Sequence, residues 1–176
     1  METSSKDVLF TIALNLDLPS LLKWCSSNSR INKNVCQNDN VWRSKLLNDY
    51  PDFQNFHLNK SLRETYIFLY QLSQIKKLLN SNESLYDIFQ RKELNLSNKK
   101  LKKVPAFDLP NLQGLHLYKN QLIKIPSFDL PNLRIFSLSG NKLTEVPAFN
   151  LPNLLILSLS NNQLTKVPGF SIFQIY

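Results

Sequence analysis

Few residues of this sequence are spaced for catalysis or metal binding. The two histidines, His57 and His116, stand alone, and Cys25 and Cys36 lack the close second pair that a zinc site uses. With only three glycines, the chain has no glycine-rich loop to hold a phosphate. We therefore expect no enzyme activity, no cofactor and no metal, and we expect the two cysteines to be reduced, partly buried thiols.

Asparagine, rather than a catalytic residue type, recurs at a fixed spacing. Asn120, Asn141 and Asn162 are 21 residues apart, and each follows a pair of alternating apolar residues. A fixed period of this length indicates a repeat architecture in which each unit stacks on the next. The units have the form LxxLxLxxNxLxxVP and cover residues 109–129, 130–150 and 151–170, preceded by a partial unit at 93–108.

Apolar residues inside each unit have the alternating spacing of a β-strand, as in Leu115-x-Leu117 and Phe136-x-Leu138. One short strand cannot bury its own apolar face, but stacked turns can. Together these features resemble the leucine-rich repeat over residues 93–170. The resemblance implies a short solenoid with a parallel concave sheet.

The same resemblance implies that Asn120, Asn141 and Asn162 form a structural ladder. Their amides would bond to backbone groups of adjacent turns, because buried polar groups need partners. Lys99 takes the asparagine position in the partial first unit. We therefore expect the first turn to be irregular and to act as a lid.

Two prolines recur on the far side of each unit, one of them in a Val-Pro or Ile-Pro pair. Proline fixes φ and lacks the N–H that a helix needs, so extended or turn structure is expected there instead of a helix. The phenylalanines that follow each pair are expected to stack as an aromatic spine, comprising Phe107, Phe128, Phe149 and Phe170.

The residues between the inward leucines form the expected binding face. Four strands spaced about 4.8 Å apart span only about 14 Å. A stable interface buries about 800 Å² on each partner, so either binding is weak or the amino-terminal half contributes. The many serines also fit an alternative, in which this face is a plain solvated sheet surface with no specific partner. The expected partner-binding residues are His116, Tyr118, Lys119, Ile135, Ser137, Ser139, Ile156, Ser158, Ser160 and Asn161.

Residues 7–47 have apolar residues at helical spacing and no repeat. Asp17 and Pro19 are expected to end the first helix after Leu16, and Ser20 is the expected N-cap of the second. A short segment of small residues and an Asp-x-x-Trp sequence follow. The expected helical segments are residues 8–16, 21–25, 29–36 and 39–47.

The order of these segments resembles an F-box, with Asn28–Ile31 and Asp39–Trp42 matching its later parts. The resemblance implies binding to a Skp-type adaptor of a cullin-RING ubiquitin ligase, with the repeats holding an unknown protein substrate. The alternatives are an ordinary helical cap and a stand-alone scaffold with no link to ubiquitin. The implied adaptor-binding residues are Leu9, Ile12, Leu16, Leu21, Trp24 and Trp42.

Taken together, the patterns predict an α+β fold in three parts. An F-box-like helical domain is expected at 1–50, and a helical bridge and amino-terminal cap at 51–92. The bridge contains a helix at Ser61–Leu79, and Leu85–Phe89 is apolar enough to cover the first repeat. Repeats, the last one incomplete, are expected at 93–176.

The net charge of +8 lies almost entirely in the second half, where residues 91–176 carry 11 basic and 4 acidic side chains. This excess favours an acidic partner or serves as a solvated lysine surface. No nucleic-acid-binding module is recognisable, so we do not expect nucleic acid as a partner. The longest early apolar stretch, Val8–Leu16, is too short to span a membrane. We therefore expect a soluble protein of the cytoplasm or nucleus.

Overall fold

The computed structural model describes residues 5–165 of the chain. Its contacts divide the chain into two compact units, with the boundary between Tyr70 and Gln71. This boundary lies inside the helix α5, Leu62–Leu79. No helix in the described range is both long and apolar enough to cross a membrane.

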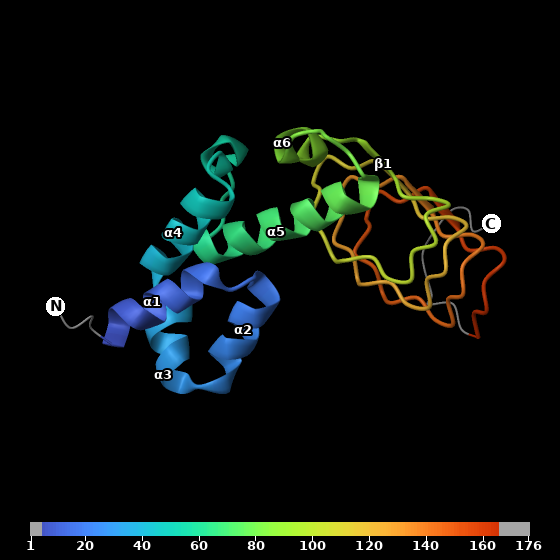
Figure 1. Ribbon diagram of the computed structural model, residues 1–176. Coiled ribbons are helices and arrows are strands. Elements are labelled where there is room, and N and C mark those ends of the chain that lie inside the picture. Colours follow the sequence, from blue (N-terminus) through green and yellow to red (C-terminus); the bar gives the residue numbers. More distant parts are fainter. Residues whose placement is uncertain (1–4, 166–176) are drawn as a thin grey trace. The chain divides into compact units, whose positions relative to one another are not determined.

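The first unit is built from helices, as its apolar spacing predicts (Figure 1). Its fully buried side chains come from different helices, and Trp42 is the largest of them. The elements are α1 (Ser5–Asn15), α2 (Leu18–Ser27), α3 (Ser29–Ile31), the π-helical turn η1 (Asn32–Cys36), α4 (Asp39–Asp49) and the 3-10 turn η2 (Phe53–Phe56), followed by the first part of α5.

Asp17 is the N-cap of α2, because its Oδ1 accepts a hydrogen bond from the backbone N–H of Ser20 at 3.0 Å. Pro19 lies in the first turn, where the missing N–H costs nothing. The prediction of Ser20 as the N-cap is therefore wrong, since Ser20 already belongs to the helix. Asn28 and Asn38 cap α3 and α4 in the same way, so each short helix begins at a side chain that accepts backbone N–H groups.

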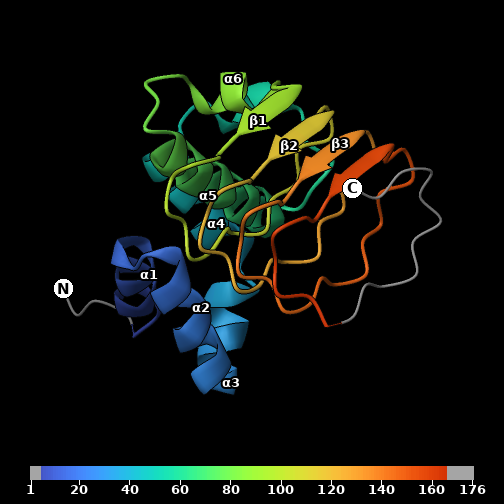
Figure 2. The same cartoon turned by 90° about the vertical axis from the view of Figure 1, so that its right-hand side faces the viewer.

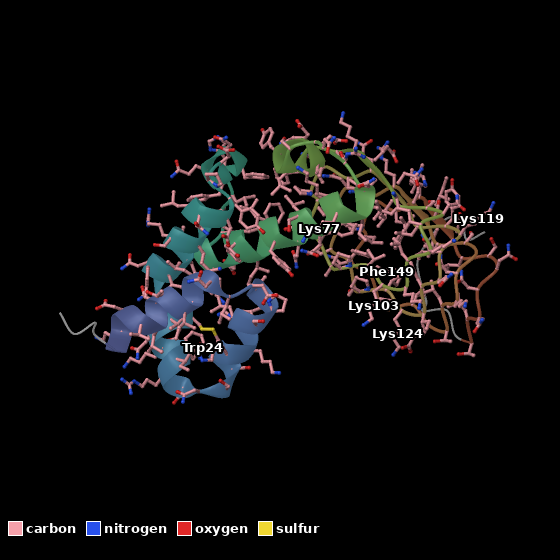
Figure 3. The ribbon with its side chains drawn as sticks, in the orientation of Figure 1. Trp24, Lys77, Lys103, Lys119, Lys124 and Phe149 are labelled. Carbon is pink, nitrogen blue, oxygen red and sulfur yellow. A yellow bond between two sulfur atoms is a disulfide. The ribbon has the colours of Figure 1, made fainter. Side chains whose placement is uncertain are left out.

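Cys25 of α2 and Cys36 of η1 form a disulfide, with their Cα atoms 6.0 Å apart (Figure 3). The expectation of two reduced thiols is therefore wrong. Helix α3 reverses the chain between the two cysteines and brings the residues together, although they are 11 positions apart in sequence. The bond ties α2 to η1 inside the buried part of the helical unit.

Lys45 connects three elements of the helical unit although it is buried. Its Nζ donates to the backbone oxygens of Leu14 and Leu16, at 3.2 and 2.8 Å, at the carboxyl end of α1. The Oδ2 of Asp49 lies 3.4 Å from the same Nζ and accepts a hydrogen bond from the hydroxyl of Tyr66 at 2.5 Å. This network joins α1, α4 and α5, and it gives the buried ammonium the partners it needs.

The environment of Asp49 and Tyr66 changes the pKa of both groups. Burial alone raises the pKa of Asp49, but hydrogen bonds from Tyr66 and Asn48 and the charge of Lys45 bring it below its usual value. Burial, and then the hydrogen bond to the carboxylate of Asp49, raise the pKa of the Tyr66 hydroxyl. Asp49 is therefore charged at neutral pH, and Tyr66 is a permanent donor to it.

The second unit contains a parallel sheet whose strands lie side by side in chain order (Figure 2). Each residue pairs with the residue 21 positions later, as Leu94 does with Leu115. No helix occurs between the strands within residues 93–165, so the recurring prolines have the effect expected of them. The strands are β1 (Glu93–Asn95), β2 (Gly114–His116), β3 (Ile135–Ser137) and β4 (Ile156–Ser158).

The core of this unit consists of the repeated leucine positions, which stack inside the coils. Leu94, Leu115, Phe136 and Leu157 share one row of the sheet and are fully buried. An α+β fold with a parallel sheet of stacked repeats is therefore confirmed.

Phenylalanines also stack along the coils, but differently from the prediction. Phe107 and Phe128 have ring centroids 4.9 Å apart. Phe136 of β3 then lies between Phe128 and Phe149, with centroids 5.8 and 5.5 Å away. A strand residue thus joins the spine, because its inward side chain reaches the same core. Phe170, the last expected member, lies outside the described residues.

Helix α6 (Leu85–Phe89) lies beside β1 at the start of the coils (Figures 1 and 2). A reciprocal pair of hydrogen bonds between Ser84 and Asp87 begins the helix. Ile88 and Phe89 are buried, so the apolar side of this short helix contacts protein and not solvent.

Candidate binding face

The amide of Asn120 joins two turns of the solenoid at the point where β2 ends. Its Oδ1 accepts hydrogen bonds from the backbone N–H groups of Lys99 and Leu101, both at 3.0 Å. Its Nδ2 donates to the backbone oxygens of Leu96 and Leu117, at 2.9 and 3.0 Å. Asn120 thereby uses its whole hydrogen-bonding capacity on main-chain groups.

Asn141 and Asn162 repeat this arrangement one and two turns later. The Oδ1 of Asn141 accepts from the N–H of Leu122 at 3.1 Å, and its Nδ2 donates to the oxygens of Leu117 and Leu138 at 2.9 and 2.8 Å. Asn162 bonds Leu143 and Leu138 in the same manner. These three side chains fix the loops that follow the strands, and so they position the rim of the concave face.

A second row of asparagines links the turns on another side of the coil. Asn132 and Asn153 each donate to the backbone oxygen of a proline one turn earlier, Pro110 and Pro131, both at 2.7 Å. Asn111 makes the corresponding bond to the side chain of Gln90, at 3.1 Å. The sequence signal for this row was present, since a Leu-Pro-Asn-Leu segment opens every full unit, but the prediction did not use it.

The residue before each ladder position has a left-handed backbone. The φ values are 59° at Asn98, 54° at Lys119, 69° at Gly140 and 55° at Asn161. Glycine and asparagine accept this conformation readily, whereas most other side chains do not. Lys119 is thus the exception in this row of the described coils. In the first turn Lys100 also has a positive φ, of 55°, so the expected irregularity near Lys99 is confined to the loop, and β1 pairs regularly with β2.

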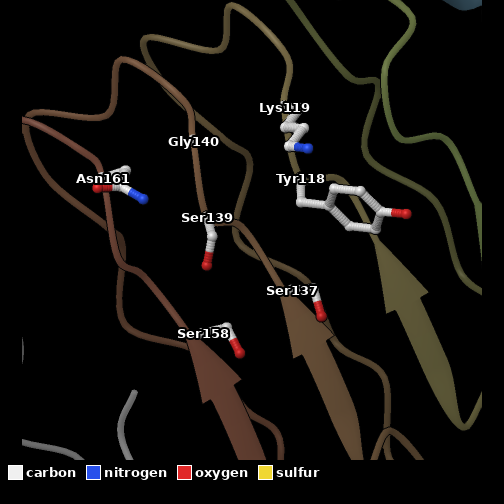
Figure 4. Close-up of a pocket in the computed structure, with 7 residues that line it drawn as sticks. All are labelled: Tyr118, Lys119, Ser137, Ser139, Gly140, Ser158 and Asn161. Carbon is white, nitrogen blue, oxygen red and sulfur yellow. The ribbon is translucent and has the colours of Figure 1, made fainter.

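A shallow hollow of about 210 Å³ lies on the concave face, above the carboxyl ends of β2 to β4 (Figure 4). Six of the ten expected partner-binding residues line it, and Gly140 contributes the seventh position. The stem of Lys119 passes beside Gly140, with its Cγ 3.5 Å from the place a Cβ would take. The lining residues are Tyr118, Lys119, Ser137, Ser139, Gly140, Ser158 and Asn161.

Most polar side-chain groups of the hollow have no hydrogen-bond partner within the described residues. Ser139 is the exception, since it accepts a hydrogen bond from the hydroxyl of Ser160 at 3.0 Å. The serine hydroxyls project from successive strands on the same side of the sheet (Figure 4). The lining includes one ammonium group and no carboxylate. The hollow therefore offers several donors and a positive charge to whatever binds there.

Glu93 and His116 occupy the other end of the concave face. Oε2 of Glu93 lies 3.1 Å from Nε2 of His116. The carboxylate of Glu93 crosses directly over Gly114, and a Cβ there would meet it at 1.8 Å, so a larger residue at position 114 would displace the Glu93 side chain from this place. Ile135 and Ile156 continue the row of Gly114 and are half-buried. His116 and the two isoleucines thus lie on the expected face but outside the hollow, and the sequence prediction missed Glu93.

The implied adaptor-binding residues fall into two groups in the helical unit. Ile12 on α1 is 43% exposed, and Val8, one helical turn earlier, is 45% exposed. Leu21 and Trp42 belong to the core, and Nε1 of Trp42 donates to the backbone oxygen of Cys36 at 2.9 Å. Core residues of this kind hold the helices together and are not available to a partner. The partly exposed remainder consists of Leu9, Leu16 and Trp24.

The described residues contain no group of three or more His, Cys, Asp or Glu side chains that could hold a metal ion.

A family model described as leucine-rich repeats (2 copies) matches residues 131–171. The matched segment includes β3, β4, Asn141 and Asn162, so residues 131–171 carry leucine-rich repeats. No F-box family model matches the helical half. No curated protein matches the chain. Repeats of this kind suggest a role in binding other proteins.

Proposed function

We propose that this protein is a non-catalytic recruiting subunit, which binds a target protein through the concave face and a Skp-type adaptor of a cullin-RING ligase through its helical unit. The adaptor half of this proposal rests on the resemblance of residues 9–42 to an F-box. The target half rests on the leucine-rich repeats and on the lining of the hollow.

The exposed apolar surface of α1 is the observation that carries the adaptor proposal. Val8 and Ile12 lie one helical turn apart, so their side chains share a face of α1. Burying the exposed part of both side chains would favour association, because apolar area removed from water contributes roughly 25 cal/mol per Å². An apolar helix face of this kind can dock into an apolar groove of a partner protein.

An adaptor pull-down with the full-length chain tests the proposal. Wild-type protein should retain a purified Skp-type adaptor, and Ile12→Asp should lose it because a carboxylate would be buried in the contact. Ile123→Asp is the matched control, since Ile123 is 54% exposed on the repeat unit. Circular dichroism should show that both variants remain folded. Equal retention of the adaptor by the two variants would contradict the proposed contact.

The second candidate function is a stand-alone repeat protein without any ubiquitin link. It is favoured by the family match, which covers residues 131–171 of the repeats and leaves the helical half unassigned. Its signature would be target binding that persists when residues 1–50 are deleted and no adaptor is present. Adaptor binding by the intact chain that is lost on the same deletion favours the recruiting subunit.

A further inference from the structure

We propose that the hollow on the concave face holds a carboxylate side chain from an acidic, extended segment of the partner protein, with Lys119 as its counter-ion. This inference rests on the proposed protein-binding function and names the chemistry of the target. The occupant follows from the charges and free donors of the hollow and its surroundings.

The free polar groups of the hollow match a carboxylate. The hydroxyls of Ser137 and Ser158 and the Nζ of Lys119 make no hydrogen bond within residues 5–165. Each can donate, and the ammonium adds a positive charge. An ionised carboxylate only accepts hydrogen bonds, and hydrogen bonds to it from charged donors are the strong ones.

The acidic residues of the surrounding coils do not compete for Lys119. The carboxylate of Glu93 lies against His116, and that of Glu145 lies 3.3 Å from the Nζ of Lys124. Because residues 91–176 carry 11 basic and 4 acidic side chains, the potential over this half attracts a negatively charged segment.

The backbone at Lys119 supplies an independent argument. Asparagine or glycine takes the equivalent position in each of the other described turns, and both accept a positive φ more readily than lysine does. Lysine at position 119 therefore makes the fold less stable than asparagine or glycine would. A strained residue at the edge of a hollow is typical of a residue kept for binding.

The shape of the face favours an extended segment. The strands are in register and about 4.8 Å apart, so a segment crossing them passes a free hydroxyl on β3 and then one on β4. The face is about 14 Å wide, so four or five residues of an extended segment are enough to cross it. Such a short contact is expected to be weak and to depend on salt.

The test uses full-length, ¹⁵N-labelled protein and a synthetic peptide of eight glutamates, with the corresponding peptide of eight glutamines as the uncharged probe. The glutamate peptide should shift the amide signals of Lys119, Gly140 and Asn161, and the glutamine peptide should not. Lys119→Asn should weaken the affinity about fivefold, as expected for the loss of one partly exposed ion pair.

Lys103→Asn is the matched control, because it removes the same charge at an exposed position near Lys124 and away from Lys119 (Figure 3). It should change the affinity less than twofold under the same conditions. Two outcomes would overturn the inference. One is a set of shifts centred on Lys103 and Lys124, and the other is equal weakening by both variants.

A titration with oligouridylate tests the alternative that the hollow binds nucleic acid. If the RNA shifted the same signals and displaced the glutamate peptide, the hollow would be a nucleic-acid site and the inference would be wrong. Adaptor binding by the same preparation distinguishes the two proposals. Peptide binding that fails while the adaptor still binds contradicts only the acidic-segment inference.

Discussion

Replacement of Asn141 by alanine tests the role of the asparagine row in holding the binding face. The side chain is buried and makes three hydrogen bonds to the main chain, with Leu122, Leu117 and Leu138. In the variant, the N–H of Leu122 would lose its side-chain acceptor, which costs roughly 1–3 kcal/mol for a buried donor.

The backbone oxygens of Leu117 and Leu138 each keep one hydrogen bond in this variant. The oxygen of Leu117 keeps its bond from Asn120, and that of Leu138 keeps its bond from Asn162. Losing one of two hydrogen bonds costs about 0.5 kcal/mol at each of the two oxygens, and the unpaired N–H of Leu122 costs about 2 kcal/mol. The free energy of unfolding of the repeat unit should therefore fall by about 3 kcal/mol. If the free energy of unfolding decreases by about 2 kcal/mol per molar urea, the urea concentration at the unfolding midpoint should fall by about 1.5 M.

Asn132→Ala is the comparison that makes the prediction specific. Asn132 also bridges neighbouring turns, but it is exposed and makes one hydrogen bond, to the oxygen of Pro110 at 2.7 Å. Water replaces that bond, so the loss should be about 0.5 kcal/mol.

Hydrogen exchange of peptides covering residues 114–143 across a urea series measures both variants. Both tryptophans, Trp24 and Trp42, precede the repeats, and their fluorescence reports the helical unit as an internal reference. Equal destabilisation by the two alanine variants would refute the reasoning, as would a loss below about 1 kcal/mol for Asn141→Ala.

Three further predictions concern stability. Lys119→Asn should raise the stability of the repeat unit by about 0.5 kcal/mol in urea titrations, because it removes left-handed strain, whereas Lys142→Asn should not. Replacing both Cys25 and Cys36 by serine should lower the free energy of unfolding of the helical unit by about 3 kcal/mol, measured by tryptophan fluorescence. Detection of two free thiols in the untreated wild type would contradict the disulfide. The pKa of Asp49 is lowered on folding, so its stabilisation is present above the unfolded value of about 3.9 and disappears as the pH falls through the folded pKa. Wild type should therefore lose more stability between about pH 5 and pH 2 than Asp49→Asn does, and identical acid curves would oppose this.

The sequence was sufficient for the repeats because their restraints recur. The same leucine row appears every 21 residues, so the register of the parallel strands follows from counting. The row containing Tyr118 and Ser139 also follows from the period, and it leads to most of the hollow.

Contacts between distant segments could not be predicted in this way. Lys45 reaches the end of α1 from 29 residues away, and a lysine in a helix gives no local sign that it will be buried. The disulfide depends on how α3 turns the chain, which the spacing of Cys25 and Cys36 does not specify. Phe136 has an inward strand position by its pattern, but its place in the aromatic row depends on ring packing in three dimensions.

The central proposal is that the helical unit connects the target-binding repeats to a Skp-type adaptor. Isothermal titration of the folded, full-length chain with a purified adaptor tests it most directly. We predict one-to-one binding with a dissociation constant below about 10 µM, which Ile12→Asp abolishes. No detectable heat at an adaptor concentration of about 100 µM, confirmed by the absence of a co-eluting complex, would contradict the proposal.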